Sequence, residues 1–183
     1  SDSIIKKAEI DSLFRVIDLS LSLYEPRSLI NQFNRDGRVN MDEHLHKVVS
    51  AALLAWKESG GCFDITVKSL VDLWGFGVGG SGKKSNGAGN KSDGAWNKSN
   101  GAGNKSKEAA NNPDGGMKTN ESRKIPSQSA IRRALQVTGS QYLLVRKDTL
   151  FATRKHVQID CNGIAQGYSV DIMFNYMLQK GLK

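Results

Sequence analysis

Residues 79–124 contain no Val, Ile, Leu, Phe or Tyr, and this 46-residue run limits most strongly what the chain can fold into. Its centre, from 86 to 106, reads NGAGNKS, DGAWNKS and NGAGNKS, a seven-residue repeat without an apolar seam for a coiled coil. Such Gly/Asn/Ser/Lys sequence buries too little surface to offset its ordering entropy. The sequence therefore predicts a disordered loop insertion, with residues 1–78 and 125–183 forming part of one domain around it.

Most of the net charge of +8 lies in the same segment. Nine of the 26 Lys and Arg residues, but only four of the 18 Asp and Glu residues, fall there, which leaves +5 on the segment. A basic nucleic-acid binder built on these lysines is a remote alternative, because Trp96 is the one aromatic residue among them. We expect passive loop expansion rather than partner binding through Trp96, and no nucleic-acid partner.

Simple counts exclude several classes of protein. Two cysteines are too few for a disulfide scaffold. No run of 18 apolar residues is present, so we expect no membrane-spanning helix. The start of the chain also lacks the basic and apolar pattern of a signal peptide. Because the first residue is Ser1, we expect a processed product or a fragment.

Helical spacing of apolar residues recurs outside the insertion. It predicts an amphipathic helix over 3–22 and a second helix around 45–56, with Asp42 as its cap and a stop at Gly60-Gly61. Ser127 opens a short helix that stops at Gly139, and a last helix runs over about 163–179. Helices therefore dominate both halves of the patterned sequence.

Short β-like runs lie together after the insertion. Residues 142–145, 149–152 and 156–159 are predicted strands joined by tight polar turns. Helices segregated from such an antiparallel meander indicate an α+β fold rather than an alternating α/β fold.

Other sequence features that can mark a binding or metal site give little support for one in this chain. Residues 75–80 fit G-x-G-x-x-G, but no helix opens after them, so a dinucleotide fingerprint is not supported. His44 and His46 are two residues apart on a predicted helix and cannot share a metal ion, and His156 has no neighbouring ligand. We interpret all three as surface or core-edge residues. Cys62 and Cys161 are expected to be small buried residues rather than a redox pair.

Three segments carry a more specific signal. Residues 21–34 read LSLYEPRSLINQFN, 60–77 read GGCFDITVKSLVDLWGFG, and 159–171 read IDCNGIAQGYSVD. In this order they resemble the FAD:protein FMN transferase (ApbE) family, with its LS-x-Y, G-x-F-D-(I/V)-T, L-W-G-F-G and A-K-G-Y-x-x-D patterns. The resemblance covers nearly the whole chain outside the insertion and implies an ApbE-like flavin transferase fold of the α+β class.

The resemblance also implies an activity. Members are Mg²⁺-dependent enzymes that attach FMN from FAD, through a phosphoester, to a Thr or Ser hydroxyl of an acceptor flavoprotein, releasing AMP. An FAD pyrophosphatase and a non-catalytic flavin-binding module are the alternatives. Members are typically lipoproteins at the bacterial cell envelope, on its periplasmic or outer face. Any membrane attachment is therefore expected only through a lipid anchor that this chain does not carry.

By resemblance, the candidate FAD contacts are Tyr24, Cys62, Phe63, Asp64, Asp160 and Gln166, and Gly163 offers a backbone oxygen to Mg²⁺. The residue types suit these roles, because a phenol ring can stack on a flat ligand and an ionised carboxylate accepts hydrogen bonds. Two alternatives stay open on the residues alone: Asp64 as a cap or turn residue, and Tyr24 as a core-edge aromatic. Gln166 departs from the commoner Lys, so we expect an altered FAD contact there.

Several family motifs fall outside the chain. An M-G-T segment would precede Ser1, and the His- and Asp-containing motifs that supply most Mg²⁺ ligands would follow Lys183. We therefore expect roughly the first half of a domain, incomplete at both ends, with no identifiable catalytic residue and little transferase activity by itself.

Overall fold

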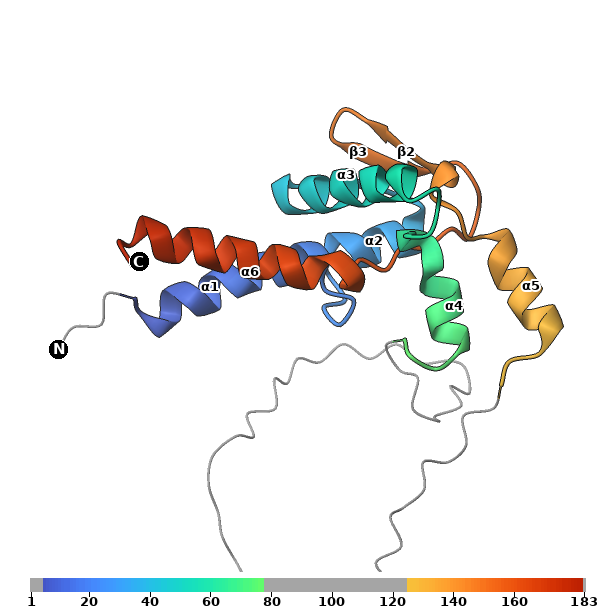
Figure 1. Ribbon diagram of the computed structural model, residues 1–183, viewed down its shortest axis with the longest axis horizontal. Coiled ribbons are helices and arrows are strands. Elements are labelled where there is room, and N and C mark those ends of the chain that lie inside the picture. The colour runs from blue at the N-terminus through green and yellow to red at the C-terminus, as the bar shows by residue number, and fades with distance from the viewer. Residues whose placement is uncertain (1–4, 78–124, 183) are drawn as a thin grey trace, which may run out of the picture.

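Helices form most of the structure, and a small antiparallel sheet covers one end of it (Figure 1). The computed structural model describes residues 5–77 and 125–182, so the predicted insertion at 79–124 lies outside the described residues. The elements in chain order are α1 Lys7–Leu21, α2 Leu29–Asp36, β1 Arg38–Asn40, α3 Glu43–Glu58, η1 Ile65–Val67, α4 Lys68–Leu73, α5 Gln128–Gln136, η2 Ser140–Tyr142, β2 Leu143–Arg146, β3 Thr149–Ala152 and α6 Asn162–Gln179.

The sheet has the strand order β1-β3-β2, with both neighbouring pairs antiparallel. In the central strand, Leu150 stands opposite Val39 of β1 and Val145 of β2. The hairpin from β2 to β3 matches the sequence prediction. The predicted strand at 156–159 is wrong, because these residues join no ladder, and the third strand is instead β1, which the sequence did not indicate.

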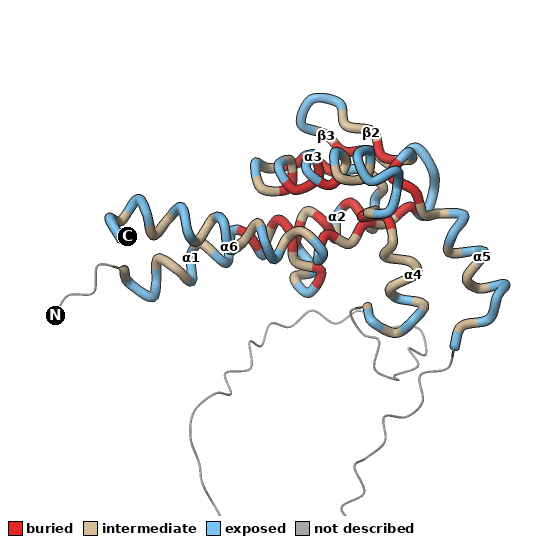
Figure 2. The backbone as a smooth tube through the Cα atoms, viewed as in Figure 1, coloured by how far each residue is buried: buried red, intermediate tan, exposed pale blue. Residues whose placement is uncertain are grey.

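The core lies where α2, α3 and the sheet meet, and Figure 2 shows the buried backbone concentrated there. Phe33 of α2, Leu45 of α3, Leu150 of β3 and Ile159 before α6 are all fully buried. In contrast, α1 and α6 extend side by side away from this core, and α4 and α5 lie together at the other end (Figure 1). None of the described helices is both long and apolar enough to cross a bilayer.

Polar side chains set the starts of three helices. Ser28, Asp42 and Ser127 accept hydrogen bonds from backbone N–H groups in the first turns of α2, α3 and α5. The caps of α3 and α5 agree with the sequence prediction. Asp42 also accepts a hydrogen bond of 2.8 Å from the fully buried Ser20 hydroxyl of α1, so one carboxylate joins two helices.

We expect Asp42→Ala to lower the free energy of unfolding by about 2 kcal/mol, because it removes a cap and leaves a buried hydroxyl without its acceptor. Asp42→Asn keeps an acceptor at both positions and should cost less than about 1 kcal/mol. Urea unfolding followed by circular dichroism measures both values. Equal stability of the Ala and Asn variants would contradict the assignment.

An ion pair joins the free ends of α1 and α6. Lys180 Nζ lies 2.8 Å from Glu9 Oε1, and Oε2 accepts a bond from the Lys6 backbone N–H. The hydrogen bond from Lys180, and then that from Lys6, lower the pKa of Glu9 from 4.5 to about 2. Both side chains of the pair are about one-third exposed, so salt screens their attraction.

The lowered pKa of Glu9 predicts a pH dependence of stability. The pair stabilises the fold fully above about pH 4.5, and this contribution is lost as the pH falls towards about 2. Glu9→Gln should therefore be less stable than the unmodified chain at pH 7, with the difference vanishing at low pH. Lys180→Met removes the other half of the pair and should show the same trend in urea unfolding. A difference that is constant with pH would contradict the role of this pair.

Candidate functional site

The Asn34 side chain ties α2 to the segment that leads into α6. Its amide nitrogen donates to the Ile159 carbonyl at 2.9 Å, and its amide oxygen accepts from the Ile159 N–H at 2.6 Å. Gln158 Nε2 also donates to the Asn34 carbonyl at 3.2 Å. The first two bonds pair the backbone N–H and C=O of Ile159 with a side chain instead of a neighbouring strand, and residues 156–159 join no ladder.

Two sequence motifs meet at the start of α6. The Asp160 N–H donates to the Ile65 carbonyl at 2.7 Å, which fixes η1 against α6. The Phe63 ring lies over Gly163: a Cβ placed on Gly163 would be 3.5 Å from Phe63 Cε2. The structure therefore brings Phe63, Asp160 and Gly163 together, as expected for residues of one site.

The Asp64 carboxylate is a hydrogen-bonding centre for the backbone around it. Oδ1 accepts from the Thr66 N–H at 2.7 Å, the Thr66 hydroxyl at 2.6 Å and the Ser140 hydroxyl at 2.8 Å. Oδ2 accepts from the Ser140 N–H at 2.9 Å, and the Thr66 hydroxyl also accepts from the Gly139 N–H. Asp64 therefore caps η1 and joins it to η2, which confirms the cap interpretation. A contact between Asp64 and FAD stays a prediction.

Asp160 also shapes the backbone. Its Oδ1 accepts from the Asn162 N–H at 2.9 Å, so the carboxylate supports the first turn of α6. Burial and, second, the neighbouring Asp160 charge raise the pKa of Cys161 to about 12, so this cysteine stays a thiol at neutral pH. Cys62 is exposed, and the expectation that it is buried is wrong, because it lies in the open turn after α3.

Tyr24, Gly163 and Gln166 face outwards. The Tyr24 side chain is 74% exposed at the turn between α1 and α2, so it is not a core-edge aromatic. It lines a shallow hollow of approximately 450 Å³ that also includes Lys68, Gln158 and Asn34. Gly163 and Gln166 are exposed one turn apart on α6. Because Asn34 also binds Ile159, it connects the Tyr24 hollow with the start of α6.

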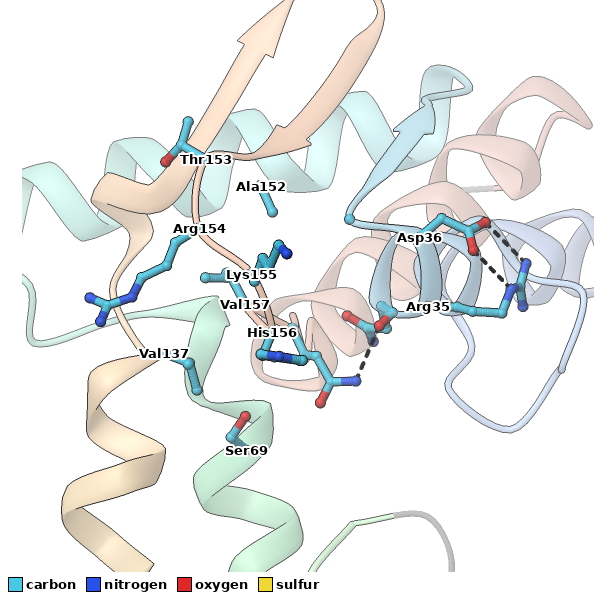
Figure 3. Close-up of a pocket in the computed structure, with 13 residues that line it drawn as sticks. Arg35, Asp36, Ser69, Val137, Ala152, Thr153, Arg154, Lys155, His156 and Val157 are labelled. Carbon is cyan, nitrogen blue, oxygen red and sulfur yellow. Dashed lines mark hydrogen bonds and ion pairs between the residues drawn. The ribbon is translucent and has the colours of Figure 1, made fainter. Parts of the chain in front are cut away.

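A second hollow, of approximately 520 Å³, lies between the end of α2 and residues 152–158 (Figure 3). Asn34, Arg35 and Gln158 line both hollows. The sequence analysis missed these residues, although Asn34 ends the first family-like motif and Gln158 directly precedes the third. Their positions at the edges of the family-like motifs could have identified Asn34 and Gln158 as candidates.

The described residues do not form a metal site by themselves. Across 5–77 and 125–182, no three His, Cys, Asp or Glu side chains lie close enough to hold one ion. His44 Nδ1 is 2.8 Å from the Tyr168 hydroxyl, which agrees with a core-edge histidine. The Gly163 carbonyl belongs to the first turn of α6, and its contact with Mg²⁺ stays a prediction.

Loss of the Asn34 side chain should loosen the connection between α2 and α6. Asn34→Ala leaves the backbone N–H and C=O of the buried Ile159 without partners and should lower the free energy of unfolding by about 2–3 kcal/mol. The control Asn40→Ala removes one bond to Thr149 at the exposed sheet edge and should cost less than about 1 kcal/mol. Urea unfolding of both variants tests this, and equal losses would contradict it.

Comparison with known proteins gives one consistent result. The family model described as "ApbE family" matches residues 2–183. A "FAD:protein FMN transferase" of Vibrio cholerae is 23% identical over 100% of this chain and 44% of its own length. A protein of the same name from Haemophilus influenzae is 32% identical over 38% of this chain and 21% of its own.

Solved structures show the same fold. "Flavin Transferase ApbE from Vibrio cholerae" superimposes with a TM-score of 0.71 at 21% identity, covering 99% of this chain and 47% of that one. The apo form of the Pseudomonas stutzeri flavinyl transferase ApbE gives 0.68 at 24% identity, covering 96% of this chain and 46% of that one. The expected α+β architecture is therefore confirmed, and the chain spans about half the length of the relatives it matches.

Proposed function

The chain belongs to the ApbE family, and from this premise we propose that it binds FAD as part of an enzyme for protein flavinylation. The proposed reaction transfers FMN from FAD to a Thr or Ser hydroxyl of an acceptor flavoprotein and releases AMP. The observation that carries the proposal is the meeting of Phe63, Asp160 and Gly163 at the start of α6 in a chain whose whole length matches the family.

Tyr24 supplies the surface that best fits a flavin nucleotide. Its ring is exposed beside the 450 Å³ hollow, whose rim carries the polar side chains of Asn31, Lys68 and Gln158. An exposed aromatic ring next to polar groups suits stacking on a flat heterocycle with hydrogen bonds at its edge. Asn31 holds this turn in place, because its amide nitrogen donates to the carbonyls of Leu23 and Glu25 at 3.0 and 2.9 Å.

The chemistry separates positioning residues from ligand contacts. Transfer forms a bond between the acceptor oxygen and the FMN phosphorus and breaks the pyrophosphate bond to AMP, while the hydroxyl loses its proton. Asp64 already accepts four hydrogen bonds, so it fits a positioning role better than that of a proton acceptor. The Cys161 thiol, with its raised pKa, is also unsuited to take part.

Magnesium dependence belongs to the same proposal. Bound Mg²⁺ would neutralise charge on the phosphates. The Gly163 carbonyl is the one oxygen of the described residues that we assign to the ion, and since no three-ligand cluster accompanies it there, we assign no step to Mg²⁺. We also propose, on family membership, a lipid-tethered location at the bacterial cell envelope, which cell fractionation tests.

Tyr24→Ala should weaken FAD binding about tenfold, because stacking on an aromatic ring contributes about 1–3 kcal/mol per base. Phe14→Ala is the matched control: it removes an exposed ring from α1 and should leave FAD affinity unchanged. Quenching of flavin fluorescence on titration with the 183-residue chain measures both affinities. Equal affinity of the two variants would reject the Tyr24 hollow as the flavin site.

A second measurement separates the possible activities. FAD, Mg²⁺ and an acceptor flavoprotein domain are incubated with the chain, and AMP and flavin-labelled acceptor are quantified. Labelled acceptor supports transfer and contradicts the expectation of little activity from this chain by itself, and AMP without labelling indicates an FAD pyrophosphatase. FAD binding without AMP agrees with both the expected low activity of this chain and a flavin-binding module. Absence of FAD binding would overturn the proposed function.

A further inference from the structure

The hollow between α2 and residues 152–158 has a lining unlike that of the Tyr24 hollow. Arg35, Asp36 and Gly37 at the end of α2 form one side, and the loop from Ala152 to Gln158 forms the other. Ser69 of α4 and Val137 after α5 close the space between them, as Figure 3 shows. The result is a cavity of approximately 520 Å³ lined largely by residues of this loop.

The backbone N–H groups of this loop are largely unpaired. At its start, Ala152 and Thr153 donate to the carbonyls of Gly37 and Tyr142, each at 2.8 Å, and at its end Ile159 donates to Asn34. Between them, the N–H groups of residues 154–158 donate to no other described residue. Residues 154–156 are exposed, so their N–H groups are accessible to solvent or to a ligand, whereas Val157 is buried.

The loop conformation is unusual at His156. His156 has a φ of 65°, in the left-handed region that non-glycine residues rarely adopt. A left-handed residue within a turn can direct successive N–H groups into one concavity, called a nest, which binds anions. The unusual φ and the free donors therefore coincide in one segment of the cavity wall.

The net charge around the cavity is positive, which is the sign that favours a bound anion. Arg154 and Lys155 carry two positive charges on the loop, and the Arg154 guanidinium is steadied by the Tyr142 hydroxyl at 2.8 Å. The one carboxylate in the lining, Asp36, is paired with Arg35 at 3.2 Å. The lining thus has a net positive charge, with one neutralised acid.

We propose that residues 154–158, together with Arg35, form a binding site for a phosphate group. A tetrahedral phosphate offers several acceptor oxygens at once and can engage a row of N–H donors and a lysine together. The volume also leaves room for a small group esterified to the phosphate. This site shares Arg35 and Gln158 with the Tyr24 hollow, but its test requires no flavin and no acceptor protein, so its outcome is distinguishable from that of the proposed flavin function.

Two-dimensional ¹⁵N NMR of the full 183-residue chain, titrated with inorganic phosphate at constant ionic strength, tests the site. We expect saturable downfield shifts of the amide protons of residues 154–158, as new hydrogen bonds form. Glycerol phosphate distinguishes an ester from the free ion, and acetate reports general anion binding. Tighter binding of glycerol phosphate than of phosphate would identify an esterified ligand.

Matched variants separate specific binding from charge screening. Lys155→Ala should weaken phosphate binding about threefold, which corresponds to the free energy that an exposed ion pair contributes. The control Lys47→Ala on α3 removes the same charge and should leave phosphate binding unchanged. Asp36→Asn should strengthen binding by releasing Arg35, whereas Glu43→Gln makes the same charge change at a distance from the cavity and should not. Shifts that are linear and spread over all basic residues, or equal effects within each matched pair, would overturn the proposal.

Discussion

The amide of Asn34 is the interaction on which the arrangement of the functional region depends. Its two hydrogen bonds to Ile159 hold the approach to α6 against the last turn of α2, in the same way that a strand partner would. Ile159 is fully buried there, and Asp160 next to it binds the Ile65 carbonyl. One side chain thus holds the segment through which the two family-like motifs meet near Gly163, and it lines both hollows.

Local patterns predicted the parts of the fold that local forces determine. The helix around Leu45 and its Asp42 cap, and the hairpin before Thr153, follow from helical spacing, capping chemistry and turn residues close in sequence. The strand β1 could not be predicted in this way, because its three residues are held by pairing with β3, more than a hundred residues later. The predicted strand at 156–159 is wrong for a related reason: the distant side chain of Asn34 binds the backbone of Ile159, and residues 156–158 pair with no strand.

The candidate site also contains both features that the sequence predicted and features that depend on contacts between distant residues. The family resemblance predicted Phe63, Asp160 and Gly163 as residues of one site, and the structure places them near one another, while their contacts with FAD and Mg²⁺ stay predictions. The network of Asp64 could not be predicted, since its partner Ser140 lies 76 residues away and belongs to no motif. Likewise, nothing local in the sequence marks the free N–H groups of 154–158, because a donor is recognised as free only when its surroundings are known.

The candidate residues therefore fall into two physical groups. The carboxylates of Asp64 and Asp160 accept hydrogen bonds from the protein's own backbone and stabilise the local conformation. Tyr24, Gly163 and Gln166 have little bonding of their own and face solvent, which is what a ligand contact requires. Gln166 also shares its face of α6 with Val170 and Phe174, which are 66% and 59% exposed. The surface beside Gln166 is therefore polar towards the start of α6 and apolar towards its end, so the two ends of this helix face offer different kinds of contact.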